Sequence, residues 1–473
     1  MLIDELQSEF AKLQHDIQTG PVYPQVAAPE IRRHLATYYD FSSPLHLDDI
    51  VEDVNEMLRK WDVQITHPRY FGLFNPSVTF ASVVADLLVA MHNPQLASWR
   101  TSPAANEIER YTLRWLASKF GFNENTLATF TNGGAEANLS AVIVALTRAF
   151  PDYGENGLRS IGGQPAIYVS SEAHDSFSKI AHMTGIGRNA IRMVATDSQL
   201  KMDLRDLEKQ IADDRRNGFI PLMVVGTCGT TTAGVIDPLA ELGLFCSAAG
   251  LWFHVDAAWG GGAIISPILR GYLAGIDSAD SITCDAHKWF SVPVGCGMFF
   301  CRHPESVSRA FRAQNAYMLG PGDDDTFDPY THSVQWSRRF MGLKLFMSLA
   351  QHGGSGHAKM IERQTRLGDL LRESLLSSGW KILNSTPLPV VCFSRDGLDV
   401  RAFLASIRER QIAWMSEADI SGTPVIRACI TSYKTTERDV LWIVEEMNRL
   451  ISEEVPTVAV QSEAQATLPA GFR

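Results

Sequence analysis

The sequence predicts an α/β protein with a large domain around a mostly parallel central sheet, a small C-terminal α+β domain and a helical N-terminal segment. Short apolar runs alternate with helical patterns between about residues 76 and 350, as at 166–169, 222–225 and 297–300. This alternation is typical of parallel strands joined by crossover helices. Residues 251–255 form a nearly continuous apolar run, the pattern of a strand buried on both faces.

The two ends of the chain differ from this large domain. Residues 1–75 are expected to be helical, with a proline-containing connection at 20–24, and they hold too few strand patterns to form an α/β domain alone. Residues 456–473 lack periodicity and are rich in Ala, Gln, Ser and Pro, which predicts a disordered tail.

Residues 351–455 are predicted to form the small domain. A glycine-rich break at 352–356 precedes a charged amphipathic helix. Strand patterns at 389–393 and 425–430 then flank a helix at 399–410, so this part of the chain combines strands and helices in one layer.

Composition excludes several classes of function. The 473 residues are 45% hydrophobic and 20% charged, which is ordinary for a globular protein with two or three domains. The net charge of −11 and the lack of a basic run argue against a nucleic-acid partner and favour a small molecule. No apolar run reaches the roughly 18 residues of a membrane span. An acidic start without a signal pattern and seven cysteines without CxxC spacing predict a cytoplasmic protein with neither disulfides nor a zinc site.

Lys288 and Asp256 form the most informative pair. Asp256 follows the buried run 251–255, so its side chain emerges at the carboxyl end of a strand, where open α/β sheets bind ligands. Pyridoxal 5'-phosphate needs a lysine that bonds to its aldehyde and a carboxylate beside its ring nitrogen. The pair therefore predicts a pyridoxal-phosphate site, against the simpler alternatives of a surface cation and a turn-forming Asp.

Three further motifs follow predicted strands. Gly133 and Gly134 precede a helical pattern, so the free amides of that helix would face a phosphate, unless the turn only leads the chain into the helix. His174 follows another strand, where an imidazole can lie over a ring or cap a helix. Residues 228–232 follow a third strand, where a small hydroxyl could bond a ring substituent, unless the segment is only a β-turn.

In this order, the motifs resemble those of the pyridoxal-phosphate-dependent group II amino-acid decarboxylases, which include aromatic-L-amino-acid and glutamate decarboxylases. The resemblance covers about residues 30–450 and includes 67–71 near the front and 336–340 behind the lysine. It implies a fold-type-I homodimer with active sites at the subunit interface. The N-terminal segment is then expected to pack on the partner subunit.

The resemblance also implies a role for each matching residue. Lys288 would bond to the cofactor, Asp256 would pair with its ring nitrogen, and His174 would stack on its ring. Ala258 would be the small residue on the other ring face, and the hydroxyl of Thr231 would lie beside the phenolic oxygen. Gly134 and Ala135 would form the phosphate cup, with the imidazole of His287 beside it.

One position departs from the family pattern. Relatives often carry Asn two or three residues before the lysine, whereas this chain carries Asp285. A carboxylate there would repel a nearby phosphate unless it points away or is neutralised.

Decarboxylases of this family return a proton to the substrate α-carbon from a Tyr on a loop that also shields the site. Residues 320–332 have the hydrophilic, Gly/Pro-rich character of such a loop, and Tyr330 is the candidate acid. The alternative is that Tyr330 is an ordinary aromatic residue of this loop, because aligning the loop and the following Arg338 and Arg339 with the family pattern requires a gap. Relatives with Phe in place of this Tyr tend toward oxidative deamination, so Tyr330 favours an amine product.

The resemblance places the substrate side chain against a front wall made of Phe71, Leu73, Phe74 and Trp99. The residues around Trp99 favour an aromatic or related bulky L-amino acid. Arg100, unless it is a surface residue, leaves open an acidic substrate of the glutamate, aspartate or cysteine-sulfinate type. A second alternative is an aminotransferase or an aldehyde-forming oxidative deaminase, since the fold also hosts such reactions.

Overall fold

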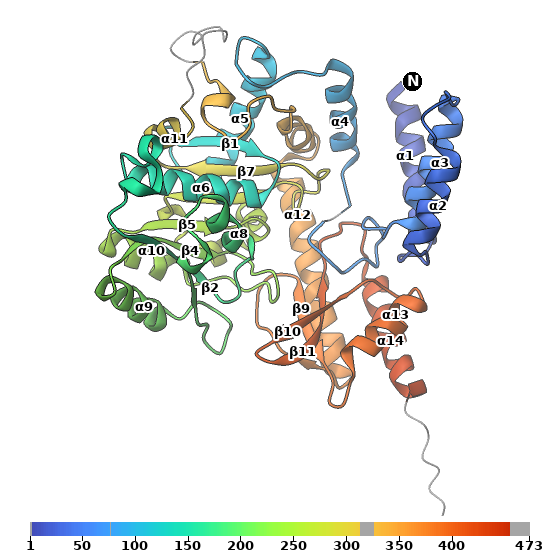
Figure 1. Ribbon diagram of the computed structural model, residues 1–473. Helices are drawn as coiled ribbons and strands as arrows, with labels where there is room; N and C mark the ends of the chain where they lie inside the picture. Colours follow the sequence, from blue (N-terminus) through green and yellow to red (C-terminus); the bar gives the residue numbers. More distant parts are fainter. Residues whose placement is uncertain (1, 76, 313–325, 455–473) are drawn as a thin grey trace, which may run out of the picture.

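The computed structural model describes residues 2–75, 77–312 and 326–454, and it contains two sheets. A seven-stranded, mostly parallel sheet with helices packed against it forms the larger body, and a four-stranded antiparallel sheet forms the smaller one (Figure 1). This architecture confirms the predicted α/β class. The predicted tail at 456–473 and part of the predicted loop, residues 320–325, lie outside the described residues.

The seven-stranded sheet has the order β1-β7-β6-β5-β4-β2-β3. β7 pairs antiparallel with β1 and β6, and the other neighbouring strands pair in parallel. Every residue of β5 and β6 is buried, as expected for central strands covered on both faces. The strands are β1 Leu127–Thr131, β2 Gln164–Ser170, β3 Ile191–Val194, β4 Phe219–Thr227, β5 Trp252–Asp256, β6 Ser281–Asp285 and β7 Gly297–Cys301.

Helices connect these strands, and their ends follow local sequence signals. Asp203 begins α9 by accepting a hydrogen bond from the backbone N–H of Arg205, and Asn93 ends α4 in the left-handed conformation that Asn tolerates. The helices are α4 Phe80–His92, α5 Pro103–Lys119, α6 Gly134–Ala149, α7 Tyr153–Asn156, α8 Ser176–Met183, α9 Leu204–Arg216, α10 Leu239–Ala249 and α11 Pro304–Ala310.

The long helix α12, Gly342–Ser377, links the two sheets. It contacts α4 and α5 in the larger body and β8, β9 and α14 in the smaller one. The glycine-rich break predicted at 352–356 is a kink within this helix, centred on Gly353, whose φ of 68° and ψ of 165° are non-helical. Glycine adopts such a backbone readily, so the helical path is interrupted here, as the glycine-rich break predicts, and resumes after the kink.

The smaller sheet has the order β10-β11-β9-β8, with antiparallel pairing throughout. Asp399 caps α13, its carboxylate accepting a hydrogen bond from the backbone N–H of Ala402. The elements are β8 Lys381–Ile382, β9 Val390–Ser394, α13 Val400–Glu409, β10 Ser416–Ile420, β11 Thr423–Cys429 and α14 Glu437–Glu454.

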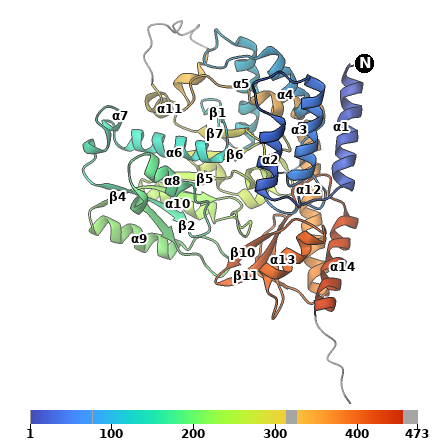
Figure 2. The ribbon, with the colours of Figure 1, turned by 45° about the vertical axis from the view of Figure 1, so that its right-hand side comes forward.

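Three N-terminal helices stand together at one side of the molecule (Figures 1 and 2). They are α1 Leu2–Thr19, α2 Ala28–Tyr38 and α3 Leu47–Trp61. Neither α2 nor α3 has a buried residue in the described chain. The exposed apolar side chains on these two helices are Leu35, Tyr38, Leu47, Val51, Val54 and Leu58.

Candidate active site

The carboxyl ends of parallel strands bring the predicted chemistry together. Asp256 is the last residue of β5, and it lies beside Thr283 of β6 in the paired strands. Lys288 follows β6 by three residues, and His174 follows β2 by four. Because β2, β5 and β6 run in one direction, these side chains share one edge of the sheet.

Asp256 is held as a hydrogen-bond acceptor. Its side chain is buried, with 6% of the residue surface exposed. Oδ2 accepts from Nδ2 of Asn138 at 2.9 Å, and Oδ1 accepts from the backbone N–H of Ala258 at 3.1 Å. Both oxygens therefore act as hydrogen-bond acceptors, the role that a carboxylate plays toward a protonated ring nitrogen.

Lys288 presents its amine to a partly open space lined by aromatic and acidic groups. Its side chain is 23% exposed, and Nζ lies 3.2 Å from Oδ2 of Asp285. The amine is 5.8 Å from the ring centroid of Phe74, which stacks on Trp259 at 4.3 Å. The indole of Trp259 in turn stacks on Trp289, so an apolar wall stands next to the amine.

The first turn of α6 forms a tight cup at the same edge. A Cβ added to Gly134 would lie 3.0 Å from Oδ2 of Asp285 and 3.2 Å from Cβ of Ala258, so a larger residue would fill the cup. A Cβ added to Gly133 would lie 3.4 Å from Cε1 of His287. The free N–H groups of a 16-residue helix attract an anion, so this cup fits a phosphate group.

Asp285 points toward this cup and not away from it. The residue is 2% exposed, and Oδ1 has no hydrogen-bond partner among the described residues. Lys288 lies 3.2 Å away and His287 3.8 Å away, and burial lowers the pKa of His287. Asp285 could avoid repelling a phosphate either by pointing away from it or by being neutralised. The geometry supplies the second, through the amine of Lys288.

The other predicted cofactor contacts lie in more open positions. His174 is exposed, and its Nδ1 accepts a hydrogen bond from the backbone N–H of Ser176, the first residue of α8. Ala135 is exposed at the start of α6, and Ala258 is partly exposed after β5. Thr231 is exposed, and its carbonyl accepts from Nε of Arg427 at 2.8 Å.

Arg427 of β11 is a functional candidate that the sequence motifs did not indicate. Its Nη1 donates to the carbonyl of Gly72 at 2.6 Å, and the guanidinium carbon lies 4.8 Å from the ring centroid of Phe74. Nη2 is buried and has no partner among the described residues. An arginine inside an apolar strand pattern, with 4% of its surface exposed, is the signal that would have found it.

The predicted front wall divides into residues that face different ways. Phe74 lies beside Lys288, and Leu73 is 53% exposed. Phe71 is fully buried in the core of the smaller sheet, and its backbone bonds to Trp414 and Cys429. The side chain of Phe71 faces that core, and its part in the substrate wall stays a prediction.

Trp99 and Tyr330 lie together in one hydrogen-bonded part of the chain. The backbone N–H of Trp99 donates to Asp328 at 2.7 Å, and the backbone N–H of Tyr330 donates to the carbonyl of Ala97 at 3.1 Å. Tyr330 belongs to the short helix η6, Pro329–Thr331, and its ring lies 5.0 Å from that of Trp336. The 97–99 segment and η6 thus form one unit.

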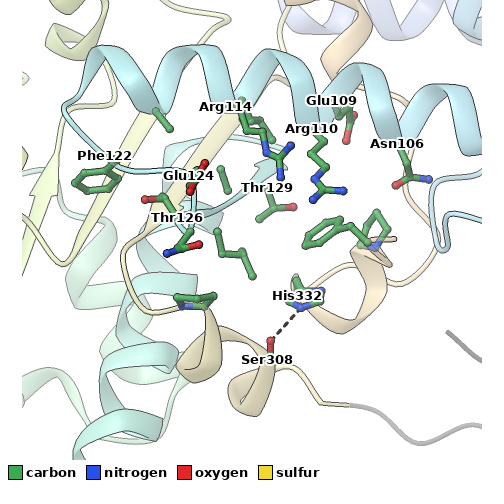
Figure 3. Close-up of a pocket in the computed structure, with 18 of the residues that line it drawn as sticks. Asn106, Glu109, Arg110, Arg114, Phe122, Glu124, Thr126, Thr129, Ser308 and His332 are labelled. Carbon is green, nitrogen blue, oxygen red and sulfur yellow. Dashed lines mark hydrogen bonds between the residues drawn. The ribbon is translucent and has the colours of Figure 1, made fainter. Parts of the chain in front are cut away.

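A pocket of about 800 Å³ adjoins this unit, between α5, the edge strand β1, α11 and η6. Figure 3 shows Arg110 and Arg114 pointing into it from α5, and Ser308 hydrogen-bonded to His332 at 3.0 Å on the opposite side. Neither Lys288 nor Asp256 lines this pocket, so it is distinct from the carboxyl edge of the sheet.

Comparison with known proteins identifies the family. Residues 31–396 match the model of the pyridoxal-dependent decarboxylase conserved domain. The chain belongs to the pyridoxal-dependent decarboxylase family. It is therefore a pyridoxal-phosphate-dependent amino-acid decarboxylase, as the sequence motifs predicted.

Individual relatives of this decarboxylase differ in substrate. The chain is 29% identical to tyrosine decarboxylase 2 of Arabidopsis thaliana, over 93% of this chain and 84% of the relative. It is 31% identical to acidic amino acid decarboxylase GADL1 of Mus musculus, over 74% and 65%. The crystal structure of Catharanthus roseus tryptophan decarboxylase in complex with L-tryptophan superposes with a TM-score of 0.87 at 25% identity, covering 95% of this chain and 97% of that one.

These findings confirm the predicted cofactor and the fold-type-I architecture of the decarboxylase. Among the described residues, no helix is both long and apolar enough to cross a membrane.

Proposed function

We propose that this decarboxylase converts an aromatic or related bulky L-amino acid into the corresponding amine. The observation that carries the proposal is the placement of Lys288 and Asp256 at the ends of adjacent parallel strands, with Phe74 beside the lysine. Bound pyridoxal phosphate supplies the electron sink for the breaking carbon–carbon bond.

The residues of the chain then have the following proposed roles. Lys288 provides the amine that holds the cofactor, and Asp256 keeps a proton on the ring nitrogen. The N–H groups of Gly134 and Ala135, with His287 beside them, hold the phosphate. The remaining contacts are the imidazole of His174 on one ring face, Ala258 on the other and the hydroxyl of Thr231 at the phenolic oxygen.

Arg427 is proposed to bind a carboxylate of the substrate. Its Nη2 is buried and lacks a partner among the described residues, and an unpaired guanidinium donor next to an aromatic face attracts an anion. Phe74 would then contact the substrate side chain, with Leu73 at the open rim. If the carboxylate is the α-carboxylate, an apolar side chain fits the rest of the wall.

Arg427 also supports the acidic alternative, in which the guanidinium holds a side-chain carboxylate. The relative that acts on acidic amino acids is consistent with this alternative. A panel of aromatic, acidic and basic L-amino acids, assayed for carbon dioxide, amine and hydrogen peroxide, separates the two. Higher kcat/KM for glutamate or aspartate than for tyrosine or tryptophan would reject the aromatic proposal.

Tyr330 is proposed to return the proton to the α-carbon, and Trp99 to complete the substrate wall. Both lie on the unit formed by the 97–99 segment and η6. In the homodimer that we propose, this unit would enter the active site of the partner subunit.

Tyr330→Phe should raise the yield of aldehyde, ammonia and peroxide at the expense of amine, because the α-carbon loses its proton donor. The relative named phenylacetaldehyde synthase motivates this test of the aldehyde-forming branch. Tyr111→Phe is the control, since Tyr111 is 69% exposed on α5. Release of amine alone at the wild-type rate would remove Tyr330 from the mechanism. Pyridoxamine phosphate without carbon dioxide would instead indicate an aminotransferase.

Borohydride reduction of the loaded enzyme, followed by peptide mapping, tests the cofactor attachment itself. The expected label is on Lys288, and a label elsewhere would overturn the proposed site. The seven cysteines are free and buried, which supports the proposed cytoplasmic location.

A further inference from the structure

Behind Asp256, a continuous chain of buried hydrogen bonds runs across β5, β6 and α6. Nε1 of Trp252 lies 2.9 Å from Oγ of Ser281, which lies 2.8 Å from Nδ1 of His254. Nε2 of His254 lies 3.0 Å from Oδ1 of Asn138, whose Nδ2 lies 2.9 Å from Oδ2 of Asp256. All five residues are buried.

The chemistry of the ionised carboxylate fixes the direction of every bond in this chain. Asp256 only accepts, so Asn138 turns its Nδ2 toward it and its Oδ1 toward His254. Nε2 of His254 must then donate to that Oδ1. Burial lowers the pKa of His254 to about 4, so the ring is neutral at pH 7 and its Nδ1 must accept.

Ser281 completes the chain consistently. Its hydroxyl donates to Nδ1 of His254, and its oxygen accepts from the indole of Trp252, a group that can only donate. Thr283 adds a second donor to Oδ1 of Asn138 at 2.6 Å. If Nδ1 of His254 carried the proton instead, Ser281 would accept hydrogen bonds from both His254 and Trp252. The hydroxyl proton of Ser281 would then lose Nδ1 as its acceptor.

We propose that Trp252, Ser281, His254 and Asn138 are positioning residues that keep Asp256 an ionised acceptor facing the ring nitrogen of the cofactor. The chain starts at a donor-only group and ends at an acceptor-only group, so its polarity cannot reverse without leaving a buried group unsatisfied. This inference rests on the proposed role of Asp256.

The tautomer of His254 tests the polarity directly. Nitrogen NMR of histidine-labelled protein, with and without cofactor, should show a neutral His254 that carries its proton on Nε2 from pH 6 to pH 9. His254→Gln assigns the signal. A proton on Nδ1, or a charged ring in this pH range, would overturn the inference.

The effect on the cofactor is tested with Ser281→Ala, which removes the hydroxyl that donates to Nδ1 of His254. Affinity for pyridoxal phosphate should fall about tenfold, because the orientation of Asn138 toward Asp256 is no longer enforced. Affinity for 1-deazapyridoxal phosphate, which has a C–H in place of the ring nitrogen, should change less than twofold. Equal losses for both ligands would mean a merely structural role for Ser281.

Ser306→Ala is the matched control, because Ser306 is an equally buried serine on α11 that does not belong to the chain of hydrogen bonds behind Asp256. It should leave both affinities unchanged. If Ser281→Ala fails to fold, the His254 tautomer in the wild-type protein still decides the question. Failure of the borohydride label at Lys288 would reject the proposed function without altering the tautomer of the cofactor-free protein.

Discussion

Asp285 places a negative charge where the cofactor phosphate is expected. Its Oδ1 has no described partner, Oδ2 faces the first turn of α6, and the nearest cation is Lys288 at 3.2 Å. When that lysine bonds to the cofactor, the carboxylate and the phosphate must share the same small cup. Asp285 is therefore expected to weaken the hold on the phosphate.

Asp285→Asn should tighten the binding of pyridoxal phosphate about tenfold, because it removes this repulsion. The measurement is the dissociation constant from fluorescence titration of the cofactor-free protein. The dissociation constant of pyridoxal, which lacks the phosphate, should change little. This comparison separates an effect on the phosphate from an effect on Lys288. Asp396→Asn makes the same charge change at a side chain that is 83% exposed, and unchanged or weaker binding by Asp285→Asn would contradict the argument.

The residues that the sequence identified, and those that it missed, differ in how they reach the site. Asp256 ends the buried strand β5 and Lys288 lies three residues after β6, so local pattern alone places them. Arg427 and Asn138 reach the same edge from β11 and α6, and a single sequence does not show which elements meet there. The sequence also did not show that Phe71 packs in the core of the smaller sheet while Phe74, three residues later, lies beside Lys288.

Among the elements, α12 shows how a glycine changes the path of a long helix. The sequence predicts a break at 352–356, and two helical stretches do meet there at the non-helical Gly353. Composition alone does not give the angle of the kink, because glycine permits many backbone conformations. The contacts of α12 with α4 and α14 hold it against both bodies.

Gly353→Ala should lower the free energy of unfolding by about 1–3 kcal/mol, because a residue with Cβ is strained at this φ and ψ. Urea denaturation measures the change. Gly154→Ala is the control, since a Cβ at Gly154 meets nothing within 4 Å and its φ is ordinary. Equal stability of the two variants would show that the kink does not depend on glycine.

At the scale of the whole molecule, stability depends on three buried histidines. Burial lowers the pKa values of His67, His254 and His357 to about 4. Each is neutral in the folded chain, and each takes up a proton on unfolding below its ordinary pKa of about 6.5. The unfolded state binds more protons between pH 6.5 and pH 4, so the folded state loses stability as the pH falls through this window.

The free energy of unfolding should therefore fall by on the order of 1–2 kcal/mol per histidine between pH 7 and pH 5. Urea unfolding at the two pH values measures the change. His357→Gln should flatten this dependence. A free energy that is the same at both pH values would show that the histidines are accessible to protons in the folded state.

The N-terminal helices are incomplete in a single chain. Since α2 and α3 bury no residue, their exposed apolar side chains need a second surface, and we propose that the partner subunit provides it. Leu58→Asp on α3 should shift the protein from dimer toward monomer at micromolar concentration, as measured by light scattering. Leu244→Asp introduces the same charge at an exposed leucine of α10 and should not. A monomeric wild-type protein with full activity would refute the dimer.

The stretch from Tyr70 to Phe74 is bonded to the smaller sheet, through Phe71 with Trp414 and Cys429 and through Gly72 with Arg427. Phe74 also stacks on Trp259, and Arg427 also donates to the carbonyls of Thr231 and Thr232, so both groups are tied to the larger body as well. One hydrophobic core runs from Trp259 to Val390 and Cys429 of the smaller sheet. The wall beside the amine of Lys288 is therefore clamped from both sides, and we expect a cavity made in this shared core to loosen that wall without removing any of its side chains.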